Sequence, residues 1–285
     1  MAKKAKELFE SVKVKTEKFK IEATKLYKKE VKGIVVLPPK GENQPLDMLV
    51  LLDVEGTFEE KFKKKDEIEK KLKELGGKLL QGINVSAIIL EEIWDMCSKG
   101  KYEILGLLAM AMPIYDTGWV GALRVTEIHK QMVLKKFEKY IVSYVLAGSL
   151  VKGRATEESD IDTFVVVDDT DVTRMTASEL RSRLRGMIWG MAEEAAMAAG
   201  VKNKLNIQVY ILTEMWDSIR SANAVIFTML RDGIPLYDRG MFQPWKLLLK
   251  QGKITPSPEA VDSFIKSGKQ ILERTKFKLK EIALE

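Results

Sequence analysis

Two aspartates, Asp160 and Asp162, open an apolar segment that has the composition of a buried strand, Ile161 to Val167. Residues two apart on a strand point to the same side, so both carboxylates are expected to face one ligand. Neighbouring like charges repel each other unless they share a cation. Carboxylate oxygens suit Mg²⁺, which keeps several waters and is usually completed by phosphate oxygens. The pair therefore predicts a metal site for Mg²⁺, with Mn²⁺ as a substitute.

A segment suited to binding phosphate precedes the two aspartates. An apolar strand expected over 141–147 ends in Gly148 and Ser149. Glycine lets a phosphate approach the backbone, and serine offers it a hydroxyl and an amide. Lys152 and Arg154 follow in a loop of small and basic residues, where their charge can offset that of a triphosphate. These two residues are assigned on charge and position only.

This arrangement resembles the DNA polymerase beta-type nucleotidyltransferase superfamily, whose signature is Gly-Ser at a strand end followed about ten residues later by Asp-x-Asp. The spacing from Ser149 to Asp160 fits that signature. The alternative is a purely structural role, in which Asp160 and Asp162 only cap a strand at a polar turn. The resemblance covers the C-terminal half of the chain throughout and the first half in outline.

The resemblance implies transfer of a nucleoside monophosphate from an NTP to a hydroxyl group, with release of pyrophosphate. It also implies that up to two Mg²⁺ ions bridge the nucleotide phosphates. Carried over residue by residue, Gly148 and Ser149 would hold phosphate, and Asp160 and Asp162 would be the metal-binding catalytic residues. Lys152 and Arg154 would be further nucleotide-binding residues.

One departure from the family pattern concerns a third carboxylate, which the family usually supplies from the next strand. That strand reads "KLNIQVYIL" here, with Asn206 and Gln208 on one face. Neither amide can act as a base, and both are poorer Mg²⁺ ligands than a carboxylate. Asp168 and Glu214 are acidic, but extended geometry puts each of them roughly 20 Å or more from the aspartate pair.

The chain also contains an internal repeat. The segment that begins "NVSAIILEEIWD" at Asn84 returns as "NIQVYILTEMWD" at Asn206, and "LDMLVLLD" ending at Asp53 returns as "IDTFVVVD" ending at Asp168. A repeat of this length indicates a duplicated domain rather than one unit of a solenoid. We therefore expect a degenerate domain over 1–122, with a basic N-terminal helix, and a second domain over 123–285 that carries the site and a C-terminal helix.

The first copy has lost most of the site. Asp47 aligns with Asp162, but Pro45 stands at the position of Asp160 and "LPPKG" replaces the Gly-Ser turn. This copy is expected to hold no metal and nucleotide, and to have a structural or substrate-positioning role.

The elements that must position these residues follow the same order in each copy, namely a Lys-rich helix, two strands, a helix, a third strand and closing helices. We expect an α/β (α+β) fold of two tandem domains, each a small mixed sheet flanked by helices. The expected helices and strands are 4–31, 33–37, 48–54 and 85–90 in the first copy, and 123–140, 141–147, 161–167, 176–200 and 205–212 in the second, with a last helix from 256 or 258 to about 280.

Composition excludes several other classes of function. The 285 residues include one cysteine and one histidine, which rules out intramolecular disulfides and Cys-rich or multi-histidine metal sites. His129 is expected on a helix surface, and Cys97 is expected to be an inert thiol. Trp94 and Trp216, at matching positions, are expected to be core anchors. No segment is long and apolar enough to cross a bilayer, so a cytoplasmic protein is the default.

The net charge of +6 is local, because residues 1–32 hold eleven lysines and five glutamates. A basic helix of this kind admits nucleic acid as a partner, although it is also typical of a solvated helix face. A second class of function therefore stays open, in which a catalytically inactive module binds nucleotide, nucleic acid or a protein. A third is an assembly scaffold whose terminal helices pair between chains, so a homo-oligomer is possible.

Overall fold

The computed structural model describes residues 16–39, 41, 44–80, 82–172, 174–221, 224–256 and 258–282. We use "first unit" for the elements up to β4. It begins with a helix whose described part is 16–26, and it continues through β1 (Val31–Val36), β2 (Leu46–Leu52), α2 (Phe58–Leu79), β3 (Ile83–Ile89), α3 (Leu90–Ser98), α4 (Glu103–Met110) and β4 (Met112–Asp116).

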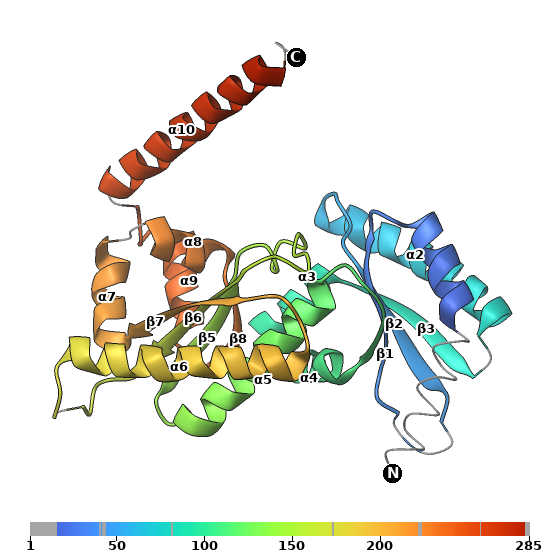
Figure 1. The fold of residues 1–285 in the computed structure, drawn as a ribbon, viewed down its shortest axis with the longest axis horizontal. Coiled ribbons are helices and arrows are strands. Elements are labelled where there is room, and N and C mark those ends of the chain that lie inside the picture. Colours follow the sequence, from blue (N-terminus) through green and yellow to red (C-terminus); the bar gives the residue numbers. More distant parts are fainter. Residues whose placement is uncertain are drawn as a thin grey trace.

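The "second unit" follows without a linker and repeats the same order (Figure 1). Its elements are α5 (Trp119–Phe137), β5 (Ile141–Ala147), β6 (Ile161–Val167), α6 (Ala177–Ala199), β7 (Leu205–Ile211), α7 (Leu212–Ser221), α8 (Ala224–Asp232), β8 (Ile234–Asp238), α9 (Phe242–Lys250) and α10 (Pro258–Ile282).

The two units have matching sheets. The strand orders are β3-β2-β1-β4 and β7-β6-β5-β8, with one parallel and two antiparallel pairs in each sheet. Strands β1 and β5 also show the same two register shifts. They lie between Val31 and Gly33 and between Ile34 and Val35 in β1. In β5 they lie between Ile141 and Ser143 and between Tyr144 and Val145. The expected fold class, two small mixed sheets flanked by helices, is confirmed.

Several expected elements agree with the structure residue for residue, namely β5, β6 and the caps of α6. The Thr176 side chain accepts a hydrogen bond from the backbone N–H of Glu179 (3.2 Å), and Gly200 ends the helix at a φ of +65°. The expected first strands are shifted by two residues, and the beginning of the N-terminal helix lies outside the described residues.

Helix α5 begins at Trp119 rather than at Leu123, because Asp116 at the end of β4 caps it. One carboxylate oxygen of Asp116 accepts from the N–H groups of Gly118 and Val120, both at 2.9 Å, and the other accepts from Gly121 at 2.8 Å. The division into domains 1–122 and 123–285 stays a prediction, and its boundary falls inside α5.

The largest group of buried side chains joins the two units. It contains one face of the first sheet, helices α3, α4 and α5, and one face of the second sheet packed on α6. A second group packs α2 and the helix at 16–26 on the first sheet, and a third packs α7, α8 and α9 on the second sheet. The first unit is therefore packed tightly against the unit that carries the candidate site.

Two expectations about single residues are corrected here. His129 is fully buried rather than on a helix surface, because α5 lies between the two units and packs on several sides. Trp94 is buried as expected, whereas Trp216 is 42% exposed and is not a core anchor. Cys97 is buried, as an inert thiol requires, and burial raises its pKa to about 12.

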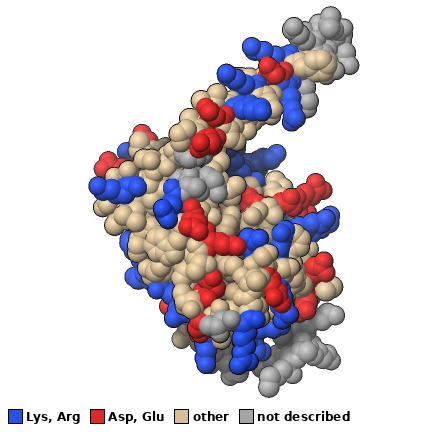
Figure 2. Space-filling view, turned by 90° about the vertical axis from the view of Figure 1, so that its left-hand side faces the viewer, with Lys and Arg blue, Asp and Glu red and all other residues tan. Residues whose placement is uncertain are grey.

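Helix α10 extends away from the body of the molecule (Figure 1). Its described side chains are exposed, and Figure 2 shows its Lys and Arg side chains projecting beyond the rest of the surface. On the face seen in that view, acidic and basic side chains are interspersed over the body. Within the described part of the chain, no helix is both long and apolar enough to span a membrane.

Candidate functional site

The geometric centre of the candidate site is the contact between Gly148 and Asp162. Strand β5 pairs with β6 so that Ala147 lies opposite Asp162, and the chain turns at the next residue. Gly148 has a φ of +77°, and a Cβ atom there would lie 2.3 Å from Oδ2 of Asp162. The backbone conformation and the close approach to the carboxylate both favour glycine, because a side chain here would be strained and would have to displace Asp162. The sequence-predicted turn and one of the two predicted metal ligands are therefore brought together.

The turn is closed by its own backbone. The N–H of Arg154 donates to the carbonyl of Ser149 (2.9 Å), and the N–H of Gly153 donates to the carbonyl of Leu150 (3.3 Å). We call residues 148–154 the Gly-Ser loop. The Arg154 side chain is exposed, and Asp160 is exposed immediately before β6. Ser149, Arg154 and Asp160 are not among the side chains that line the cavity described below.

Asn206 binds the second aspartate directly. It lies opposite Asp162 in the parallel pair of β6 and β7, and its side-chain Nδ2 donates a hydrogen bond to Oδ1 of Asp162 (3.0 Å). The first unit keeps the same pair, since Nδ2 of Asn84 donates to Oδ1 of Asp47 at 3.2 Å. One of the four carboxylate oxygens of Asp160 and Asp162 is thus engaged by an amide donor.

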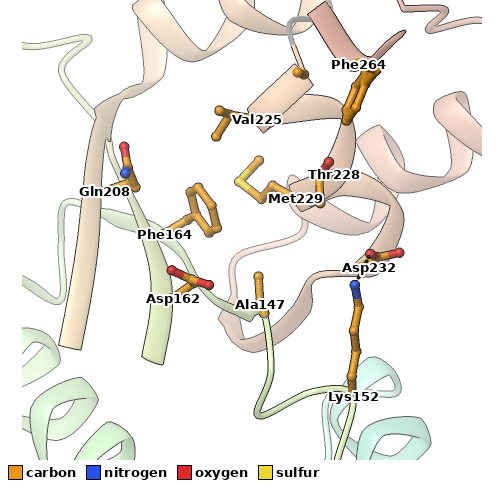
Figure 3. Close-up of a pocket in the computed structure, with 12 residues that line it drawn as sticks. Ala147, Lys152, Asp162, Phe164, Gln208, Val225, Thr228, Met229, Asp232 and Phe264 are labelled. Carbon is orange, nitrogen blue, oxygen red and sulfur yellow. Dashed lines mark ion pairs between the residues drawn. The ribbon is translucent and has the colours of Figure 1, made fainter. Parts of the chain in front are cut away.

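A cavity of about 360 Å³ opens beside Gly148 and Asp162. Figure 3 shows that Phe164 of β6 and Val225 and Met229 of α8 point into it, and that Phe264 of α10 stands at its rim. Gln208 of β7 closes the side next to Asp162. The lining is mostly apolar, with Asp162 and Gln208 on one side and Lys152 and Asp232 on the other (Figure 3), and a mainly apolar lining with a few polar groups is the usual character of a small-molecule site.

Lys152 lines the cavity, but it has an acidic partner. Its Nζ lies 3.1 Å from Oδ2 of Asp232, the last residue of α8 (Figure 3). Arg231 also binds Asp232, with its Nε 2.7 Å from Oδ1. The hydrogen bond from Arg231 is the largest influence that holds the pKa of Asp232 down at about 2, and Lys152 adds to it. Asp232 therefore stays ionised and keeps Lys152 at the edge of the cavity.

Sequence reasoning missed Asp232 and the apolar wall. In the repeat register, Asp232 corresponds to Met110 of the first copy, and a position-by-position comparison of the two copies would have revealed that acid. The wall residues of α8 and α10 carry no motif, so only the fold brings them to the site. The sequence also offers Asp168 and Glu214 as further acids. Asp168 accepts a hydrogen bond from Thr170, and Glu214 pairs with Arg181, so both bind residues outside the site.

The comparisons with known proteins agree with this geometry. Residues 127–207 match the family model described as "Nucleotidyltransferase domain", a range that includes the Gly-Ser loop, both aspartates and Asn206. These residues are thus similar in sequence to a nucleotidyltransferase domain. The match lies within the second unit and supports nucleotidyl transfer as the general class of activity.

No curated protein matches the chain. Among solved structures, the chain is similar to one titled "Crystal structure of the toxin-antitoxin with AMP-PNP", at 18% sequence identity and a TM-score of 0.24, covering 55% of this chain and 97% of that one. The assignment of residues 127–207 therefore rests on the family match.

Proposed function

We propose that the second unit is an Mg²⁺-dependent nucleotidyltransferase with a single site, which transfers a nucleoside monophosphate from an NTP to a hydroxyl acceptor. The observation that carries this proposal is the Gly148 turn, packed against the Asp162 carboxylate inside a segment that matches the nucleotidyltransferase domain. A Cβ atom at residue 148 would come within 2.3 Å of that carboxylate, so glycine lets the backbone of the turn lie directly against the proposed metal ligand.

The donor set fits a magnesium site that a substrate completes. Asp160 and Asp162 together carry four carboxylate oxygens, and the one engaged by a protein amide is Oδ1 of Asp162. Within the described residues, no group of three or more His, Cys, Asp or Glu side chains could enclose a metal ion. Mg²⁺ suits such an open site because it keeps waters and takes phosphate oxygens as further ligands. When bound, it would neutralise charge that develops on the phosphates.

The remaining residues support a nucleotide in one orientation. The triphosphate would lie along the Gly-Ser loop, where Ser149 offers a hydroxyl and an amide. The base would lie against the apolar wall formed by Phe164, Val225 and Met229. Lys152 is positioned between these regions by Asp232.

In the proposed reaction the acceptor hydroxyl oxygen forms a bond to the α-phosphorus of the NTP. The bond from the α-phosphorus to the bridging oxygen breaks, and pyrophosphate leaves with that electron pair. The proton of the acceptor hydroxyl passes to solvent water, since Asn206 and Gln208 carry no group that can accept it. The chemistry of this chain's own residues is therefore confined to binding and positioning.

A second candidate function is a catalytically inactive module that binds nucleotide, nucleic acid or a protein partner. The hydrogen bond from Asn206 to Asp162 favours it, because an amide donor occupies a carboxylate oxygen that a metal would otherwise use. The same pair in the first unit, at 3.2 Å, persists without a Gly-Ser turn and so has a structural role there.

Label transfer distinguishes the two functions. The full-length protein is incubated with each α-³²P-labelled NTP, Mg²⁺ or Mn²⁺ and a cell extract that supplies acceptors. The Asp160→Asn/Asp162→Asn double variant is compared with Asp47→Asn, which removes the corresponding acid of the first unit. A nucleotidyltransferase gives a labelled product with the wild type and with Asp47→Asn, and none with the double variant. If the folded wild type binds Mg²⁺ and NTP but gives no product, the module is the correct function.

A further inference from the structure

Two tryptophans hold the Gly-Ser loop of the second unit. Trp94 belongs to the first unit, and Trp119 lies where the two units join. Nε1 of Trp119, at the start of α5, donates to the carbonyl of Leu150 at 3.0 Å, and Nε1 of Trp94 in α3 donates to the carbonyl of Val151 at 3.0 Å. The two indole rings pack on each other with centroids 5.7 Å apart. Both are buried, Trp119 completely. Two successive carbonyls of the loop are thus bound by one aromatic pair.

These hydrogen bonds fix the direction of the loop amides. A trans peptide is planar, and its carbonyl and N–H point in opposite directions. No cis peptide occurs in the described chain. When the carbonyls of Leu150 and Val151 point toward the tryptophans, the N–H groups of Val151 and Lys152 must point away from them. The tryptophans therefore set which side of the loop presents its donors.

The rest of the loop is seated on the first unit at close range. Gly153 is buried at a φ of +67°, and a Cβ atom there would lie 2.7 Å from Oδ2 of Asp53 and 3.0 Å from Leu90. A Cβ atom on Gly118 would lie 2.2 Å from the backbone nitrogen of Glu157. Glycine lets the loop backbone approach first-unit side chains at Gly153, and lets two backbones approach each other at Gly118.

The repeat provides an internal comparison. Trp216 occupies the position of Trp94 in the second unit, where it is 42% exposed and packs edge-to-face on Trp245. The position of Trp119 is taken by Met241. The burial of Trp94 and the hydrogen bonds to the loop are thus particular to the contact between the units, and do not follow from the repeated fold alone.

We propose that Trp94 and Trp119 are positioning residues, through which the degenerate first unit holds the Gly-Ser loop of the second unit in its nucleotide-binding conformation. Nucleotide as the ligand rests on the proposed function, whereas the control of loop conformation does not. This role accounts for a first unit that has lost its own turn and its first aspartate. The site is complete only when both units are packed together.

The test uses full-length Trp94→Phe, Trp119→Phe and the double variant, which remove the indole N–H and keep an aromatic ring. Trp245→Phe is the matched control, since Trp245 is 1% exposed and contacts Trp216 rather than the loop. The first measurement is amide hydrogen exchange over 149–154, with β5 as an internal reference for global stability. We expect about tenfold faster exchange in the loop for the double variant and no loop effect in the control. Unchanged loop exchange in a folded double variant overturns the proposal.

The second measurement is calorimetric binding of inorganic tripolyphosphate with Mg²⁺, a probe that needs no base. We expect roughly five- to twentyfold weaker binding for the double variant, and wild-type affinity for Trp245→Phe. Faster loop exchange with unchanged binding overturns the nucleotide-positioning role. If the wild type itself does not bind the probe, the proposed function fails, and loop exchange alone then decides whether the tryptophans hold the loop.

Discussion

At the scale of single residues, the site depends on the absence of a side chain at residue 148 as much as on the carboxylates beside it. Gly148 has a left-handed backbone, and Oδ2 of Asp162 lies where a Cβ atom would be. We expect Gly148→Ala to abolish binding of Mg²⁺ with NTP, because the methyl group must displace the Asp162 carboxylate or the turn. Calorimetry with Mg²⁺ and a nonhydrolysable NTP analogue measures this effect.

The matched control is Gly200→Ala, since Gly200 has a φ of +65° and open space around its Cβ position. Both variants lose roughly 1–2 kcal/mol for a left-handed alanine. Comparable loss of binding in the two variants would attribute the effect to backbone strain and would contradict the steric argument.

Asn206 offers a second test at this scale, because it binds Asp162 and is one of the two positions where the resemblance implies a third carboxylate. We expect Asn206→Asp to lower the melting temperature in EDTA, since two carboxylates then face each other across β6 and β7. Mg²⁺ should reverse this loss, and at about 100 times its Kd it would add roughly 2.7 kcal/mol. Differential scanning fluorimetry with and without Mg²⁺ checks both expectations.

Asn84→Asp in the first unit is the control for this variant, because it creates the same acid pair with Asp47 where the Gly-Ser turn is absent. We expect it to be destabilised without a gain from Mg²⁺. An equal response to Mg²⁺ at both positions would show that the acid pair alone binds the metal.

At the scale of elements, the sequence predicted strands β5 and β6 and the caps of α6 correctly, but it did not predict the surroundings of helix α5. The strands β5 and β6 were predictable because each is a mainly apolar run bounded by turn residues, and the caps of α6 were predictable from Thr176 and Gly200. Helix α5 lies between the two units, so polar residues on it are buried together with apolar ones. A one-sided amphipathic pattern cannot indicate this, and the surface location predicted for His129 was wrong.

Buried His129 gives the stability of the protein a specific pH dependence. Its Nε2 donates to the carbonyl of Ile188 (3.0 Å), so its Nδ1 accepts from the Tyr144 hydroxyl (2.7 Å), and burial lowers its pKa to about 4. The unfolded chain binds this proton near pH 6.5, so the contribution is complete above pH 6.5 and is lost as the pH falls toward 4. The expected loss at pH 5 is about 2 kcal/mol.

Two measurements check this dependence. His129 is the only histidine in the chain, so its ring proton signals in NMR should show no titration between pH 7.5 and pH 5 in the folded protein. Urea unfolding gives the free energy of unfolding at pH 7.5 and at pH 5. Its decrease between these pH values should be about 2 kcal/mol smaller for His129→Gln than for the wild type. A midpoint near pH 6.5 in the folded protein would contradict the prediction.

At the scale of the whole molecule, the candidate site is assembled from distant parts of the chain. The Gly148 and Asp162 contact was predictable, because β5 and β6 are adjacent antiparallel strands, so the end of β5 lies beside the start of β6. The tryptophans of the first unit, Asp232 at the end of α8 and Phe264 in α10 were not, since only the packing of the units and helices brings them there. A motif search finds the residues that are proposed to bind phosphate, whereas the wall and the support of the loop come from tertiary structure.

Helix α10 carries the last of these contributions, because Phe264 stands at the rim of the cavity on a helix that otherwise projects into solvent (Figure 3). Phe264→Ala is expected to weaken NTP binding roughly fivefold, about the 1 kcal/mol that one aromatic contact contributes. The unfolding free energy should change little, since the side chain is 45% exposed. Phe277→Ala is the control on the same helix, at 65% exposure and away from the cavity. Equal affinities for the two variants would mean that α10 does not contribute to nucleotide binding, whereas a loss confined to Phe264→Ala would place the base against this helix.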